Sequence, residues 1–241
     1  HLRIHLNNNQ RRGFCQIKVE DMVQQYIVDE IMSHNIKPGE RVYETQLAEQ
    51  LGVSRTPVRH AIGRLVSEGI LEDPHREKGY VVPILTPQDM KHVYVMRELL
   101  EGEAAFEAAQ SISQKDIAYL KELNVKEEQS FKNSDRKAYT AINKELHSKI
   151  VQMSGNLYLQ RFFRQVFWKS QLYTFYLSSF YSSSTEIFPL SSQKPLSYLE
   201  HARVIHAIAS RDPEKARQEM ITHIRMSYKE RFVDIGHFFE S

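Results

Sequence analysis

The chain has 241 residues, with 32 Lys and Arg against 30 Asp and Glu and a formal net charge of +2. This near balance excludes a protein that coats nucleic acid through bulk positive charge, and no apolar run reaches the ~18 residues of a membrane span, so we expect no membrane contact. The single cysteine, Cys15, excludes an intramolecular disulfide and fits a reducing cytoplasm.

Residues 45–69 predict two helices joined by a tight turn, and they are the most informative part of the chain. Leu47, Ala48 and Leu51 fall at i, i+1 and i+4, which is one face of a short helix. Gly52 follows at once, at a place where a backbone with positive φ can end a helix. The small side chain of Ala48 also permits close packing of a second helix.

The second helix is expected to carry cations on its outer face. Ser54 is placed to cap it, and Val58, Ile62 and Leu65 form a buried stripe at i, i+4 and i+7. Arg55, Thr56 and Arg59 fall outside this stripe near the N-terminal end, where a helix-turn-helix makes its base and phosphate contacts. Two amphipathic helices around a glycine also occur in other α-helical proteins. The absence of any acid between positions 50 and 67 favours DNA binding.

Two short strands are predicted after this helix pair, at residues 69–72 and 79–82, with a polar turn between them. A helix-turn-helix followed by a β-hairpin is a winged helix. The tip of the wing would offer His75, Arg76 and Lys78 to the DNA backbone or minor groove.

The remainder of the chain reads as an all-helical bundle with a core of its own. Thr86, Pro87 and Asp89 give a capping residue, a proline at the first helical position and an acid in the first turn. The predicted helices cover residues 86–110, 113–131, 134 or 135–153, 157–180, 194–210 and 212–237, with a Ser-rich loop over 182–194.

Histidines on three of these helices are candidates for a metal site. Asn143 and His147 are four residues apart and share a helix face, while His201 and His223 lie on two further helices. Three imidazoles that converged would leave a coordination position open for an oxygen ligand. Spacing alone leaves open the alternative that these histidines are scattered over helix surfaces or held in ordinary hydrogen bonds.

Arg97 is a candidate for binding an anionic ligand. Its guanidinium could hold a carboxylate through two hydrogen bonds. The alternative is a solvated surface pair with Glu101, one turn further along the same helix, which would contribute little.

The N-terminal part closely resembles the DNA-binding domain of GntR-family transcription regulators, over about residues 18–83. The resemblance is carried by residues 38–42, Leu47 and Ala48, the run 51–59, and residues 65–69. It implies that a homodimer binds double-stranded operator DNA. Ser54, Arg55, Thr56 and Arg59 match recognition-helix contacts, His75 matches a wing contact, and Thr45 occupies a contact position where the family often has arginine.

The C-terminal part resembles the effector domain of the FadR-like branch, in its metal-containing FCD group. The resemblance is carried by residues 143–147, 154–156, 200–201, 212–213, Ala216 and His223, and residues 93–101 resemble the first helix of that domain. It implies a divalent metal (zinc, nickel or manganese) and a small organic acid as effector, with Arg97 as a ligand contact. The metal ligands are one Asp and three His in the family, at positions that are here Asn143, His147, His201 and His223. Asn143 keeps a carbonyl oxygen but lacks the negative charge.

We therefore expect a mainly α protein with an N-terminal winged helix-turn-helix and a C-terminal helical bundle. Residues 1–17 are a polar tail, 18–83 the DNA-binding domain, and 84–241 the effector-binding and dimerisation domain. The expected function is that of a cytoplasmic, ligand-responsive repressor that binds a palindromic operator. A metal-free regulator of an acyl or other apolar ligand is the alternative. A metalloenzyme built on the histidines is disfavoured, because the chain has no His-Glu-x-x-His run, nucleophile signature or Gly-rich phosphate loop.

Overall fold

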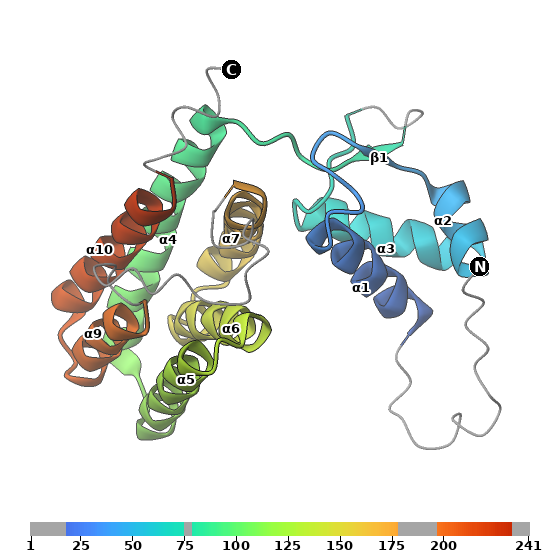
Figure 1. The fold of residues 1–241 in the computed structure, drawn as a ribbon. Helices are drawn as coiled ribbons and strands as arrows, with labels where there is room; N and C mark the ends of the chain where they lie inside the picture. The colour runs from blue at the N-terminus through green and yellow to red at the C-terminus, as the bar shows by residue number, and fades with distance from the viewer. Residues whose placement is uncertain (1–17, 75–78, 178–196, 233–241) are drawn as a thin grey trace. The chain divides into compact units, whose positions relative to one another are not determined.

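The computed structural model describes residues 18–74, 79–177 and 197–232, and the chain divides into two compact units between Leu85 and Thr86. Helices dominate both units, as Figure 1 shows. The predicted fold class, mainly α with an N-terminal helix-turn-helix and a C-terminal helical domain, is confirmed. In the part of the chain that is described, no helix is long and apolar enough to cross a membrane.

The first unit is built on three helices, α1 (Val19–Met32), α2 (Glu44–Leu51) and α3 (Arg55–Ser67). Its core lies where α1 and α3 pack together, and every member of the predicted stripe of α3 is buried there. The opposing stripe of α1 consists of Val23, Ile27 and Ile31, at i, i+4 and i+8. The sequence prediction did not delimit α1, although this spacing is a helical signal.

The turn between α2 and α3 has the expected form. Gly52 closes α2 in the left-handed region at φ +67°, and the backbone N–H of Val53 donates to the carbonyl of Ala48 at 3.1 Å. Ser54 occupies the N-cap position of α3, but its hydroxyl makes no capping hydrogen bond. The exposed N-terminal turn of α3 therefore keeps its backbone N–H groups available to an anion.

The predicted wing is only partly correct. Strand β2 (Tyr80–Val81) pairs in antiparallel register with β1 (Arg41–Val42), which was not predicted, and only Glu72 of the expected strand 69–72 joins it, through a single bridge to Val81. The physical reason lies in the end of α3. The N–H groups of Ile70 and Leu71 donate back to the carbonyl of Leu65, so they complete the helix end instead of a β ladder.

The second unit is a bundle in which α4 packs against α6, α7, α9 and α10. Side-chain caps at Thr86, Ser113 and Asp135 start the first three helices, and each accepts the backbone N–H three residues on. The helices are α4 (Pro87–Ser111), α5 (Gln114–Lys132), α6 (Arg136–Met153), α7 (Leu157–Leu177), α9 (Ser197–Ala209) and α10 (Pro213–Phe232). The predicted loop 182–194 and the predicted helix ends at 180 and 237 lie outside the described residues.

Tyr173 ties α7 to the start of α4. Its side chain is fully buried, and its hydroxyl lies 2.6 Å from Oδ2 of Asp89 and accepts the backbone N–H of Thr86 at 3.1 Å. Thr86 is the first residue of the second unit. The beginning of that unit is therefore held by a side chain from the far end of α7.

Candidate metal centre and nucleic-acid interface

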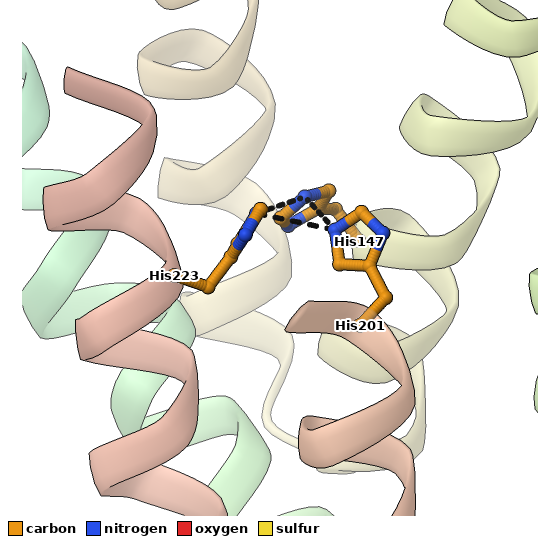
Figure 2. A group of neighbouring side chains, drawn as sticks. All are labelled: His147, His201 and His223. Carbon is orange, nitrogen blue, oxygen red and sulfur yellow. Dashed lines mark hydrogen bonds between the residues drawn. The ribbon is translucent and has the colours of Figure 1, made fainter. Parts of the chain in front are cut away.

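Three imidazoles from α6, α9 and α10 point toward one another in the interior of the bundle (Figure 2). The Nε2 atom of His201 lies 3.2 Å from that of His147 and 3.1 Å from that of His223, and the third separation is 3.3 Å. All three side chains are buried. The structure thus brings together the three histidines that were predicted as metal ligands.

Each imidazole is held from behind by a buried glutamate. Nδ1 of His201 lies 2.8 Å from Glu127 on α5, and Nδ1 of His223 lies 2.6 Å from Glu200 on α9. Nδ1 of His147 is hydrogen bonded in the same way to Glu101 on α4. A carboxylate behind each ring is the usual arrangement around a metal-binding histidine, because it fixes the tautomer and makes the ring a better donor.

This arrangement determines what the centre of the cluster can hold. A carboxylate accepts hydrogen bonds, so each Nδ1 carries the proton and each neutral ring presents the lone pair of Nε2 to the centre. Three lone pairs at this spacing repel one another unless a cation lies between them. Ligand nitrogens around a tetrahedral zinc ion, with bonds of about 2.0–2.1 Å, lie about 3.3 Å apart. The donor set and its spacing therefore fit a divalent metal.

The protonation states of His147 and Glu101 are those that a metal site requires. Burial lowers the pKa of His147 to about 4 against the raising effect of Glu101, so its ring is neutral near pH 7. Burial raises the pKa of Glu101, but Arg97 and His147 outweigh this effect, and the net pKa is well below the usual range. A neutral imidazole beside an ionised carboxylate is the form in which histidine binds a metal.

Arg97 is committed to Glu101, but not as a surface pair. Its Nε donates to Oε1 of Glu101 at 2.6 Å, and both side chains are buried. The guanidinium also lies over the ring of Phe167, 4.9 Å from its centroid, and the same ring is 5.5 Å from that of His147. The solvated pair that was the alternative for Arg97 is therefore wrong in its exposure. Arg97 belongs to a continuous chain of contacts that ends at the histidine cluster.

Asn143 lies one turn before His147 on α6 and is half-buried. Within the described ranges its side chain has no hydrogen-bond partner, so its amide is not committed elsewhere. The glutamates behind the rings were missed by the sequence prediction. Glu200 had a visible signal, since it precedes His201 directly, and Glu101 was considered only as a partner of Arg97. Glu127 comes from a helix without any predicted ligand, so no sequence signal marked it.

The predicted DNA-binding residues of the first unit lie exposed on and beside α3. Ser54, Arg55, Thr56 and Arg59 occupy its first turns, and Thr45 is exposed on α2. His75, Arg76 and Lys78 of the wing lie outside the described residues. The absence of acids between positions 50 and 67 does not leave the arginines unpaired. Acids of α1 and α2 approach them, and the pairs are Arg55 and Arg59 with Glu44, Arg64 with Asp21, and His60 with Glu20.

Comparison with known protein families accounts for both units. The sequence model of the gntR family of bacterial regulatory proteins matches residues 19–81, and that of the FCD domain matches residues 92–226. The chain belongs to the GntR family and carries an FCD domain. Its relatives are transcription regulators and not enzymes.

Individual relatives extend along most of the chain. The Nta operon transcriptional regulator of Aminobacter aminovorans is 27% identical over 207 residues, which are 82% of this chain and 87% of the relative. The probable D-xylose utilization operon transcriptional repressor of Paenarthrobacter nicotinovorans is also 27% identical, covering 86% of this chain and 85% of its own length. The solved structure of E. coli McbR/YncC has a TM-score of 0.70 at 23% identity, covers 89% of this chain and 97% of its own, and supports the fold.

Proposed function

We propose that this GntR-family regulator is a metal-dependent sensor of a small organic acid. Operator binding by the first unit would be controlled by ligand binding to the second. The observation that carries the sensing part is the convergence of three buried Nε2 atoms within 3.3 Å of one another, each ring held by its own carboxylate. In a metal-free bundle the Nε2 lone pairs of these three histidines would face and repel one another, so the arrangement favours a bound cation.

The DNA-binding surface is assigned to the exposed side of α3 and its neighbours. Arg55 and Arg59 would contact base edges or phosphates. Ser54 and Thr56, at the N-terminus of α3, would contact the DNA backbone, and Thr45 would add a contact from α2. His75 and Arg76 are assigned to the wing contact.

The test of this surface uses a duplex that the wild-type protein selects from a random-sequence library. Combined Arg55→Ala and Arg59→Ala substitution should abolish the mobility shift of that duplex, because two cationic contacts are lost. Lys121→Ala with Lys137→Ala is the matched control, since it removes the same charge from exposed positions of the second unit. Normal binding by the Arg55/Arg59 variant would overturn the assignment.

In the second unit, His147, His201 and His223 would hold the metal, and the side-chain oxygen of Asn143 is proposed as a further ligand. A divalent ion there supplies a Lewis-acidic centre that attracts an anionic oxygen. Charge supports this proposal despite the missing aspartate, because Glu101, Glu127 and Glu200 are hydrogen bonded to the three histidines, and Arg97 pairs with Glu101 alone of the three in the contacts between described residues. Arg97 keeps Glu101 ionised and adds positive potential that attracts a carboxylate ligand.

Metal content is the direct test. Protein purified without chelator should contain one divalent ion per chain, and His201→Ala should lower this content to near background. His206→Ala, at an exposed position of the same helix, should leave it unchanged. Wild-type protein that neither contains metal nor takes it up on titration with zinc, nickel or manganese would favour a metal-free regulator with an apolar ligand.

The regulator is proposed to act as a cytoplasmic homodimer on a palindromic operator. A two-fold symmetric site matches a symmetric pair of recognition helices, and the spacing of its half-sites depends on how the dimer holds them. Exposed apolar side chains on one face of α4 (Val95, Met96 and Leu99) are suitable for contact with a second copy. We assign repression, with the ligand weakening operator affinity, in line with the relative that is named a repressor. Light scattering and mobility shifts with added carboxylic acids test these assignments.

A further inference from the structure

Glu44 occupies a special position in the first unit, because it joins three elements. It is the first residue of α2, and its carboxylate accepts hydrogen bonds from Arg59 of α3 and from Tyr80 of β2. Arg59 approaches with Nε at 3.1 Å and Nη2 at 3.1 Å from Oε2, and Arg55 lies 3.8 Å from the same oxygen. One carboxylate therefore holds both arginines that are proposed to read DNA.

The burial of Glu44 separates this contact from ordinary surface pairs. Its side chain is 14% exposed, whereas the arginines that it holds are about 60% exposed. In the pair of Arg64 with Asp21 both partners are 43–48% exposed, so that pair contributes little. The hydrogen bond of Arg59 lowers the pKa of Glu44, so the carboxylate stays ionised at neutral pH. The N-terminus of α2 also favours a negative charge at this position.

We propose that Glu44 is a positioning residue for operator recognition, which holds Arg59 by its Nε–Nη2 edge and turns the rest of the guanidinium outward. This inference rests on the proposed DNA-binding surface. A held guanidinium loses less side-chain entropy when it meets a base edge with the correct geometry. The same carboxylate lowers the attraction of both arginines for phosphates in DNA of any sequence. Glu44 thus raises the ratio of specific to non-specific binding from both sides.

Substitution of Glu44 should therefore change specificity and not only affinity. For Glu44→Gln we expect weaker binding to the duplex selected by the wild-type protein and tighter binding to poly(dI–dC). The ratio of the two affinities should fall by about 5- to 150-fold, the range that one misplaced bidentate base contact corresponds to. The plot of log affinity against log salt for poly(dI–dC) should become steeper, because freed arginines gain phosphate contacts.

Matched variants show whether a change in the specificity ratio comes from the positioning of Arg59, from the loss of a charge, or from misfolding. Glu49→Gln makes the same charge change at an exposed position of α2, and it should leave the specificity ratio unchanged. Glu44→Asp should restore part of the ratio. Tyr80→Phe removes a single hydrogen bond to Glu44 and should lower the ratio less than Glu44→Gln does. If thermal unfolding shows that Glu44→Gln does not fold, Tyr80→Phe becomes the test: a lower specificity ratio supports the positioning role of Glu44, and an unchanged ratio contradicts it.

The outcomes also distinguish this inference from the assignment on which it depends. Equal effects of Glu44→Gln and Glu49→Gln, or equal losses on both DNA probes, would overturn the positioning role of Glu44. If the Arg55/Arg59 double variant still abolishes the shift in that case, the DNA-binding surface itself stands. Sequence-specific binding by the double variant would instead overturn the surface and the inference together.

Discussion

Glu127→Gln provides a sharp test of the histidine cluster, because it should move metal affinity and stability in opposite directions. Glu127 is fully buried on α5, and Oε2 accepts the hydrogen of His201 Nδ1 at 2.8 Å. Its other oxygen, Oε1, is buried without a hydrogen-bond partner among the described residues. A glutamine keeps the shape and an acceptor oxygen but removes the negative charge.

The magnitude follows from the position of the carboxylate behind a metal-binding ring. Loss of such a partner weakens metal binding by about 10- to 100-fold, which is about 1.4–2.8 kcal/mol. In metal-free protein, burial of the Glu127 charge beside an imidazole without a cation partner is unfavourable. Removal of that charge outweighs the unpaired amide group that glutamine leaves at the Oε1 position, and it should raise the free energy of unfolding by about 1 kcal/mol. A residue that only supported the packing of the bundle would lower both quantities.

Zinc affinity can be measured by competition with a chromophoric chelator, and stability by urea unfolding in the presence of chelator. Glu128→Gln, at the next position of α5, is the control. The carboxylate of Glu128 lies at the surface and pairs only with Lys132 among the described residues. That variant should match the wild type within ~0.5 kcal/mol in both measurements. Unchanged zinc affinity in Glu127→Gln, or a parallel loss of affinity and stability, would refute the reasoning about the carboxylates.

Further outcomes are expected for the cluster and the wing. Arg97→Ala leaves Glu101 buried without its cation, so urea unfolding should show a loss of about 3–5 kcal/mol; a loss below ~1 kcal/mol would mean that the pair behaves as a surface pair. Because the folded-state pKa of His147, about 4, lies below the usual value, the unfolded chain binds the extra proton first as the pH falls. The stability of metal-free protein should therefore be complete above about pH 6.5 and decrease toward about pH 4, by up to ~1.4 kcal/mol per pH unit. If the free energy of unfolding, measured by urea titration, did not change with pH over this range, His147 would not be buried in its neutral form. Gly79 has φ +81°, and in Gly79→Ala the added Cβ would lie 2.7 Å from the ring of Tyr43, so the melting temperature of this variant should fall. An unchanged melting temperature would show that the backbone at residue 79 adjusts without cost.

The fold was largely predictable because most of its signals are local. The cap at Thr86, the left-handed Gly52 and the stripe of α3 each depend on residues within a few positions of one another. The wing was predicted less well. Its pairing of Arg41 with Val81 joins segments forty residues apart, and the end of α3 claims the backbone groups of Ile70 and Leu71.

The histidine cluster was predictable in its members but not in its surroundings. Helical phase and the family resemblance pointed to His147, His201 and His223, whose convergence depends on the packing of three helices. Glu127 could not be derived in this way, since it is 74 positions from its partner His201. The acids that pair with the arginines of α3 were not predicted for the same reason, because Glu44 and Asp21 lie outside residues 50–67.

Helix α7 connects two places that the chain separates by about sixty residues. Phe167 packs against the ring of His147 near the middle of the helix, and Tyr173 grips the backbone of Thr86 and the side chain of Asp89 near its end. These two side chains are six residues apart, about 9 Å along the axis, and a helix is stiff over that length. A shift of the helix at Phe167 would therefore also move Tyr173. The surroundings of the histidine cluster and the first residue of the second unit are thus held by the same helix.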